Sequence, residues 1–349
     1  MEDIKTVYAV QFLRRTFPLL SWCLLLMGSL LSPGISGAAQ IHPMNVTNSS
    51  PIILVQGLPN ARNPEITEPG QTAVNMLYDV SSNFTFENSA NETLMFDGET
   101  TNATISFKAG LTQGLDLEIQ VPYISHAGGY LDSFIVNWHD LFGLPQNDRD
   151  EAPQNQLDYS YQKDGVAALN LQEPVGGVGD VQLILGYQMH QHWLPKQGNL
   201  AFKTAIKFPT GNSTDLTGNG AYAVSAWLAG DMHTDWFNFQ GLTYLSLGGM
   251  WLEQGEVLPD QQRSWVWFGG IGSGIKISKR IVLQAQLDAH SPFYENSSFV
   301  EIDSYALLLT LGGNVQFSKK WNLDIGVVED LVVHASPDVV FHLGLNGRF

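Results

Sequence analysis

The chain has 349 residues and a formal net charge of −17, and charged residues make up only 15% of it, against roughly 25% in ordinary soluble domains. The acidic balance excludes nucleic acid as a partner, because phosphate binding requires basic surfaces. The only cysteine, Cys23, lies in an apolar run near the N-terminus, so the rest of the chain cannot be a disulfide scaffold.

Residues 1–39 have the order of a secretory signal peptide. Arg14 and Arg15 precede the apolar run 17–31, and small residues follow it. The run has about 15 residues, fewer than the roughly 20 that a membrane-spanning helix needs; a signal anchor is the alternative. We therefore expect export, cleavage near residue 39 and a periplasmic N-terminal segment at 40–71.

From residue 72 onward, apolar and polar residues alternate with a period of two. Leu115, Leu117 and Ile119, for example, alternate with acidic residues. Such alternation is typical of strands with one apolar and one wet face. It predicts about twelve strands, and weaker runs at 51–57 and 165–174 would raise the number to fourteen. The predicted strands are 72–87, 100–109, 114–123, 178–189, 199–209, 220–231, 236–249, 264–277, 280–290, 303–317, 321–332 and 338–349.

The connections between these strands sort by length. Alternate connections are short turns, whereas those between them are mostly long, such as 88–99, 210–219 and 291–302. This sorting is typical of outer-membrane barrels, which have short periplasmic turns and long extracellular loops. Lipid offers no hydrogen bonds, so a sheet that crosses it must close. The predicted fold is therefore all-β, an antiparallel transmembrane β-barrel over 72–349 in the bacterial outer membrane.

Polar residues of each predicted strand face the lumen once the apolar face is turned toward lipid. Lys203 and Lys207 share the inward face of one strand, and Asp116, Glu118 and Asp288 face inward on others. These side chains are candidates for a lumenal charge ladder or a selectivity feature. The alternative is an ordinary polar interior.

One long extracellular insert, 124–177, breaks the alternation. Its apolar residues between 131 and 142 recur at helical spacing, and Gly143 and Pro145 would end the helix. We expect this amphipathic helix to fold into the barrel mouth as a gate or plug; a position on the rim is the alternative. The gate or plug candidates are Asp132, which is also the predicted N-cap, Phe134, Trp138, His139 and Phe142.

The last predicted strand ends on an aromatic residue, Phe349, after the outward-facing Phe341, Leu343 and Leu345. A terminal aromatic residue on an alternating strand resembles the signal by which barrel-assembly machinery recognises its clients. We expect this strand to pair with the first and close the ring. The expected partners are outer-membrane lipid, the assembly machinery, periplasmic chaperones and a small permeant molecule.

Motifs for catalysis are absent from the sequence. No G-x-S-x-G, H-E-x-x-H or Walker pattern occurs. His190 and His192 are spaced to share a strand face, but no third metal ligand is evident. We therefore expect neither enzymatic activity, nor a metal, nor a cofactor.

Several stretches resemble known envelope families. Residues 176–189 and 205–222, with Phe349, look like the barrel family associated with phenol-degradation operons, in which a G-x-G-D strand precedes a K-x-P-T-G loop. A closer similarity is to a bacterial envelope family known only as a domain of unknown function. The stretches that carry it are 97–100, 128–150 and 336–345.

These resemblances cover nearly all of the chain after the signal peptide, imply a Gram-negative outer membrane and transfer no catalytic residue. We expect a passive channel for a small molecule, with apolar or aromatic compounds as the candidate permeants and the insert as its gate. The alternative is a non-conducting barrel with a structural or partner-binding role. Fold alone does not choose between these functions.

Overall fold

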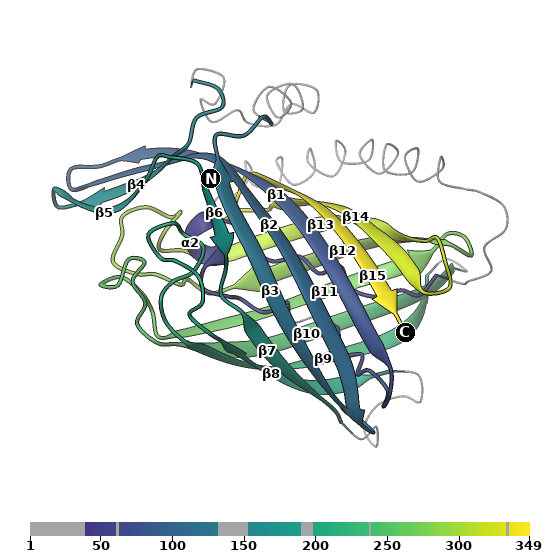
Figure 1. Ribbon diagram of the computed structural model, residues 1–349. Helices are drawn as coiled ribbons and strands as arrows, with labels where there is room; N and C mark the ends of the chain where they lie inside the picture. The colour runs from purple at the N-terminus through teal and green to yellow at the C-terminus, as the bar shows by residue number, and fades with distance from the viewer. Residues whose placement is uncertain (1–38, 61–62, 132–152, 190–197, 237–238, 333–334) are drawn as a thin grey trace, which may run out of the picture.

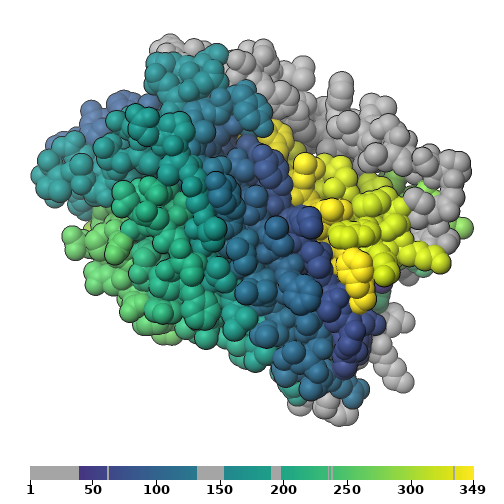
Figure 2. All heavy atoms as spheres, viewed as in Figure 1, coloured from purple at the N-terminus to yellow at the C-terminus, as the bar shows by residue number. Residues whose placement is uncertain are grey.

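Strands β1 and β15 lie side by side and close the sheet into a barrel (Figure 1, Figure 2). The structure, a computed structural model, describes residues 39–60, 63–131, 153–189, 198–236, 239–332 and 335–349. Within these ranges 12 antiparallel strands form the ring. The barrel strands are β1 (Thr72–Asn88), β2 (Glu92–Thr112), β3 (Leu115–Ala127), β7 (Gln182–Gln188), β8 (Leu200–Lys207), β9 (Ala223–Trp236), β10 (Phe239–Leu252), β11 (Trp265–Lys276), β12 (Ile281–His290), β13 (Ala306–Gln316), β14 (Trp321–Asp330) and β15 (Val339–Arg348).

Outward apolar and inward polar side chains alternate along the wall strands, as the sequence predicts. Along β10, Leu245 and Leu247 are 58% and 65% exposed on the outer face, while Ser246 between them is buried. An outer face of this kind suits lipid, and closure of the ring gives every wall strand a hydrogen-bonding partner on both sides. The predicted all-β barrel of about twelve strands is confirmed.

The two ends of the barrel differ, and we name them by their connections. The turn end carries the connections 113–114, 277–280 and 317–320, and the loop end carries 208–222, 253–264 and 291–305. Exposed aromatic side chains lie at both ends: Trp265 and Trp267 near the loops, and Trp236 and Phe349 near the turns. Such placement is typical of the aromatic girdles at the two membrane interfaces.

One expectation for the loop end needs correction. The predicted loop at 88–99 is mostly strand, because β1 and β2 continue past the barrel as a hairpin that turns at 89–91. The described parts of the 124–177 insert, which lie outside the predicted helix, form strands, and one of them coincides with the weak strand predicted at 165–174. These are β4 (Asp158–Lys163) and β5 (Val166–Leu171), which extend the projecting hairpin in Figure 1, and β6 (Val175–Val178), which pairs with the upper part of β3.

The N-terminal segment, residues 39–71, also differs from expectation. It lies inside the barrel, where Figure 1 shows it in purple, rather than as a separate periplasmic segment. The weak strand prediction at 51–57 is wrong, because the structure has a short helix there, α2 (Pro51–Leu54). Pro51 suits the first helical turn, since its fixed φ is already helical and its missing N–H needs no partner there. Among the described residues, no helix is long and apolar enough to cross a membrane.

Candidate functional site

The ascending arm (residues 39–50) of the N-terminal segment runs along the inner wall from the turn end toward the loop end. Near the turn end, His42 Nε2 lies 3.0 Å from Asp324 Oδ1 of β14. Farther along, the backbone of Met44 exchanges two hydrogen bonds of 3.2 Å with the side-chain amide of Gln286 on β12. A lumenal side chain of the wall thus satisfies both backbone groups of Met44.

Glycines of the inner wall make room for this arm. A Cβ atom at Gly274 would lie 2.5 Å from Ile41 Cγ2, and one at Gly326 would lie 3.2 Å from Met44 Sδ. A glycine inside a strand weakens the sheet and often marks the close approach of other atoms. The wall is therefore shaped to accommodate the segment.

Helix α2 turns the segment back at the loop end. Tyr294, in the connection 291–305, donates a hydrogen bond of 3.0 Å to Ile52 O and accepts one of 2.6 Å from Gln56 Nε2. Asn219 Nδ2 donates to the other amide atom, Gln56 Oε1, at 2.8 Å. Burial raises the pKa of Tyr294 above its usual value, so the phenol remains protonated and acts as a donor.

Apolar packing around α2 closes the loop end. Ile52 and Ile53 are fully buried in one cluster with Leu216, Leu258 and Phe293, which come from three different loop-end connections. Burial of each such side chain contributes roughly 1.5–3 kcal/mol. We call this cluster the cap.

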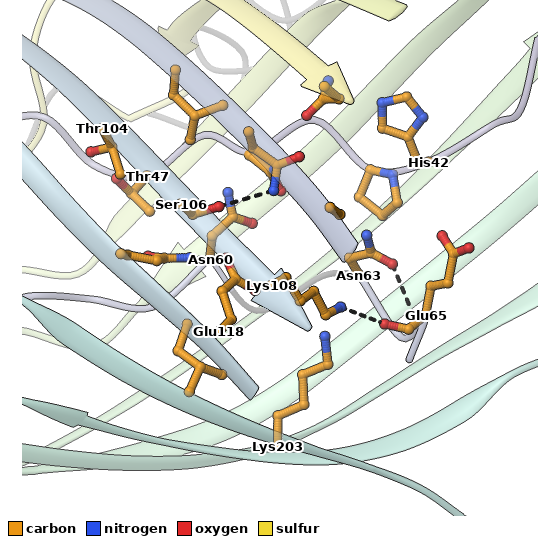
Figure 3. Close-up of a pocket in the computed structure, with 18 of the residues that line it drawn as sticks. His42, Thr47, Asn60, Asn63, Glu65, Thr104, Ser106, Lys108, Glu118 and Lys203 are labelled. Atoms are coloured by element: carbon orange, nitrogen blue, oxygen red, sulfur yellow. Dashed lines mark hydrogen bonds between the residues drawn. The ribbon is translucent and has the colours of Figure 1, made fainter. Parts of the chain in front are cut away.

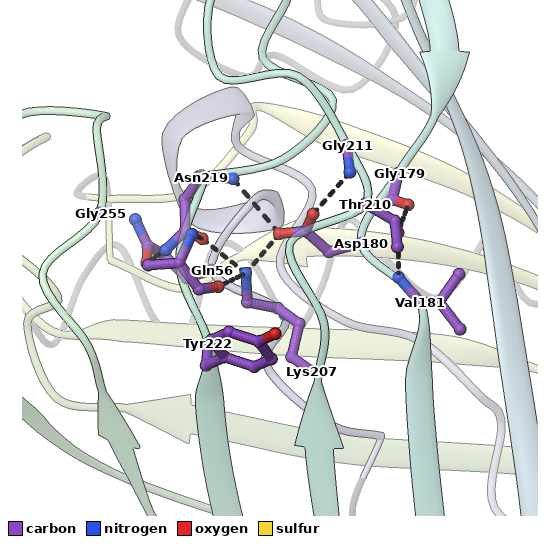
Figure 4. A network of polar contacts seen from close by, with 12 residues as sticks. Gln56, Gly179, Asp180, Val181, Lys207, Thr210, Gly211, Asn219, Tyr222 and Gly255 are labelled. Carbon is purple, nitrogen blue, oxygen red and sulfur yellow. Dashed lines mark hydrogen bonds and ion pairs between the residues drawn. The ribbon is translucent and has the colours of Figure 1, made fainter.

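A buried ion pair joins the cap to the wall (Figure 4). The ammonium of Lys207 at the end of β8 forms an ion pair with Asp180 and donates hydrogen bonds to Asn219 Oδ1 at 2.5 Å and Ala221 O at 2.9 Å. Asp180 Oδ1 also accepts from Gly211 N at 2.8 Å. Lys207 faces inward as predicted, but all three of its N–H groups are engaged by Asp180, Asn219 and Ala221 beneath the cap.

Thr210 completes this network. Its hydroxyl donates to Gly179 O at 2.7 Å and accepts from Val181 N at 2.9 Å. The G-x-G-D and K-x-P-T-G stretches of the sequence therefore meet in space, with the loop of the second holding the aspartate of the first.

The descending arm (residues 56–60 and 63–71) returns to the turn end through a cluster of charges. Arg348 binds both carboxylate oxygens of Glu65, at 2.5 and 2.6 Å. Lys108 Nζ donates to Glu65 O at 2.8 Å and lies 3.0 Å from Asp116 Oδ2. Thr67 N donates to the same Asp116 oxygen at 2.7 Å, so this predicted lumenal carboxylate holds the segment in place.

The segment does not fill the lumen. A polar cavity of about 820 Å³ remains between its two arms and the wall (Figure 3). The predicted Lys203 and Glu118 both line it. Asp288 shares the inward face of β12 with Gln286 and His290, which contact the ascending arm, and does not line the cavity. The predicted selectivity role of these side chains stays a prediction.

The sequence analysis missed four residues that hold this site together: Glu65, Lys108, Asp180 and Arg348. The strand alternation places Lys108 and Arg348 on the inward face, so this pattern alone could have identified both as lumenal residues. No alternation pattern could identify Glu65, because the sequence of the N-terminal segment has no regular period.

The predicted gate helix lies within 132–152, outside the described residues, as do His190 and His192. This applies to all five gate or plug candidates, Asp132, Phe134, Trp138, His139 and Phe142.

The C-terminal strand closes the ring as predicted. Phe349 exchanges two backbone hydrogen bonds of 2.9 and 3.0 Å with Thr72, the first residue of β1. Its ring packs edge-on against Trp321 with 5.5 Å between centroids, and Leu343 is 45% exposed on the outer face. Leu345 and Phe341 alternate with inward polar residues on the same strand. Recognition of this strand by assembly machinery stays a prediction.

A model of the protein family described as "Protein of unknown function (DUF3187)" matches residues 19–349. This supports the sequence resemblance to an envelope family of unknown function, while the resemblance to the phenol-degradation barrels stays an expectation. A search of curated protein sequences finds no match.

Several solved barrels have a similar structure. An outer membrane channel described as COG4313, from Pseudomonas putida F1, has 16% sequence identity and a TM-score of 0.52, with 82% of this chain and 97% of that chain covered. The KdgM porin has 9% identity and a TM-score of 0.41, covering 79% and 99%. The toluene transporter TbuX of Ralstonia pickettii has 10% identity and a TM-score of 0.38, covering 90% and 96%. At these identities the likeness is one of fold.

Proposed function

The chain belongs to the DUF3187 family, and from the geometry of its lumen we propose that it is a gated channel of a Gram-negative outer membrane. Its short turns would face the periplasm and its loop end the outside. The permeant would be a small molecule that occupies the lumenal cavity, and the N-terminal segment would control passage.

The observation that carries this proposal is the cavity of about 820 Å³ enclosed within the barrel. A cavity of this size lies within the roughly 300–1,000 Å³ range of small-molecule sites, so the lumen has room for a solute. The descending arm beside the cavity is held partly by solvent-exposed polar contacts such as Glu65–Arg348. Polar contacts exchange with water at modest net cost, which suits a part that moves.

The cavity lining favours a polar permeant over the apolar or aromatic one expected from the sequence. Its wall presents amides, hydroxyls and charges, such as Gln182, Thr104 and Lys203. An apolar solute would have to desolvate these groups without replacing their hydrogen bonds, which costs free energy.

The cap is the observation that favours the second candidate, a non-conducting envelope barrel. Ile52 and Phe293 are fully buried in it, so α2 blocks the loop end in this conformation. A channel must therefore displace the segment or part of the cap before solute passes.

A disulfide that fixes the ascending arm to the wall tests the proposal. Ile41 Cγ2 lies 2.5 Å from the Cβ position at Gly274, compatible with the roughly 3.5–4.5 Å that separates Cβ atoms in a disulfide. The chain has no cysteine after Cys23, so an I41C/G274C variant of the mature protein would form one defined bond. In planar bilayers we expect the wild type to conduct, the oxidised variant to lose most of its current, and reductant to restore it.

The single variants I41C and G274C serve as controls and should not respond to oxidant or reductant. Current that is unchanged by the disulfide would rule out gating by the segment. Absence of current from both the wild type and the reduced double variant would rule out the channel and favour the structural alternative.

A further inference from the structure

Two connections at the turn end repeat one short motif. Residues 277–281 read I-S-K-R-I, and residues 317–321 read F-S-K-K-W. In each, an apolar residue and a serine are followed by two basic residues and then by the first residue of a wall strand, Ile281 of β12 or Trp321 of β14. The lumen and the cap do not use these basic residues, so the repetition points to a separate role.

Both turns have the same hydrogen bonds. In the first, the backbone N–H groups of Ile277 and Ser278 donate to Ile281 O at 3.1 and 3.3 Å. The second repeats this pair of bonds at 3.3 and 3.2 Å, with Trp321 O as the acceptor. In each turn the serine hydroxyl also accepts a hydrogen bond of 3.2 Å from the backbone N–H of the second basic residue. Bonds of this kind stabilise a turn, so the backbone that carries each basic pair is fixed.

The two turns lie side by side. Strands β12 and β13 pair with each other, and Gln316 N, just before the second turn, donates a hydrogen bond of 2.8 Å to Arg280 O of the first. Lys279, Lys319 and Lys320 are exposed. With Arg280 they form one surface, which we call the basic patch.

Basic charge is concentrated at this patch although the chain is acidic. The two turns hold four basic residues and no acidic one, whereas the three loop-end connections 208–222, 253–264 and 291–305 hold seven acidic residues and one basic residue. Charges of one sign that cluster on a surface create a local potential that attracts the opposite sign. The patch is therefore suited to an anionic partner.

Aromatic side chains place the patch at the membrane interface. Phe317 and Phe349 are 39% and 48% exposed, and Lys320 Nζ lies 4.8 Å from the centroid of the Phe349 ring. Aromatic rings collect at the level of the lipid headgroups, and lysine side chains lie along apolar surface with the ammonium group in the polar layer. The ammonium groups of the patch thus reach the level of lipid phosphates.

We propose that the basic patch is a docking surface for the headgroup of an anionic glycerophospholipid in the leaflet that surrounds the turn end. The lysine ammonium groups contact the phosphate, and the acyl chains lie against the apolar outer wall. Basic clusters beside a membrane attract anionic lipids in this way. The inference rests on the orientation given under the proposed function, with the turns on the periplasmic side, and does not depend on conductance.

Native mass spectrometry of the full mature protein in detergent tests the surface by measuring lipid binding directly. The probes are dioleoyl phosphatidylglycerol and dioleoyl phosphatidylethanolamine, which share their acyl chains and differ in headgroup charge. We expect the wild type to bind phosphatidylglycerol at least about fivefold more tightly. The triple variant K279Q/K319Q/K320Q should lose this preference, whereas K279R/K319R/K320R should retain it because the charge is kept.

Lys320→Gln and Lys276→Gln form a matched pair of single variants. Both remove one positive charge near the turn end, but Lys276 lines the lumenal cavity. Only Lys320→Gln should weaken the preference for phosphatidylglycerol. Equal affinity of the wild type for the two lipids, a preference that survives in the triple glutamine variant, or an equal loss in Lys276→Gln would each overturn the surface.

Poly-L-glutamate separates a lipid from an acidic protein as the partner. If the wild type bound poly-L-glutamate, the triple glutamine variant did not, and neither preferred phosphatidylglycerol, the lipid would be replaced by an acidic protein. Conductance without a lipid preference would leave the channel standing and remove this inference. A lipid preference without conductance would remove the channel and leave the docking surface standing.

Discussion

Lys207 shows how a single residue can lie on the predicted face and yet serve another purpose. The alternation of apolar and polar residues correctly placed Lys207 on the inward face, where a selectivity role was expected. Its three N–H groups instead meet Asp180, Asn219 and Ala221 beneath the cap. Both members of the Lys207–Asp180 pair are at least 95% buried. At such a site the loss of one partner costs more than the loss of both, because a single charge then remains buried without a partner.

We therefore predict that Asp180→Asn destabilises the barrel by about 3 kcal/mol. The double variant Asp180→Asn/Lys207→Met should recover a large part of this loss, since it leaves no buried charge unpaired. Urea unfolding in detergent, followed by tryptophan fluorescence, measures both. If Asp180→Asn were as stable as the wild type, the pair would have no role in holding the cap.

At the scale of elements, the N-terminal segment and the barrel wall are complementary. The ascending arm follows a path where the wall has glycines, and its polar contacts go to side chains on β12 and β14. The cost of these glycines to the sheet is offset by the contacts that the arm makes. The segment is therefore part of the folded barrel and not an appendage.

Gly274→Ala tests this complementarity. The new Cβ atom would lie 2.5 Å from Ile41 Cγ2 and 3.1 Å from Gln284 Cγ, and overpacking of this kind costs roughly 1–3 kcal/mol. Gly249→Ala is the matched control, because a Cβ there would meet only Val266 O at 3.8 Å. We expect a lower unfolding midpoint for Gly274→Ala alone. Equal midpoints for the two variants would show that the arm does not press on the wall at this position.

At the scale of the whole molecule, closure depends on the two ends of the barrel sheet. β15 pairs with β1 over ten residues, from Ala73↔Arg348 to Ser82↔Val339, and Phe349 extends the pairing to Thr72. An open barrel would expose unpaired edges to lipid, which is prohibitively costly.

We predict that deletion of Phe349 lowers the yield of membrane-inserted barrel several-fold while export to the periplasm continues. The deletion removes the terminal aromatic ring that packs on Trp321 and the last backbone pair of the seam. Heat-modifiable mobility in gels of outer-membrane fractions measures folded barrel, and Phe349→Trp, which keeps an aromatic ring, should fold normally. A normal yield after deletion would refute an assembly role for this residue.

The sequence by itself determined the barrel, because alternation is a local property of each strand and lipid forces the sheet to close. It therefore predicted the number of strands, the inward faces of Lys203 and Glu118 and the pairing of the last strand with the first. The sequence did not predict where the N-terminal segment lies. The contacts that place this segment, such as His42 with Asp324, join residues 282 positions apart and leave no period to detect. Only the tertiary structure decided that the segment lies in the lumen, and with it the position of the cavity.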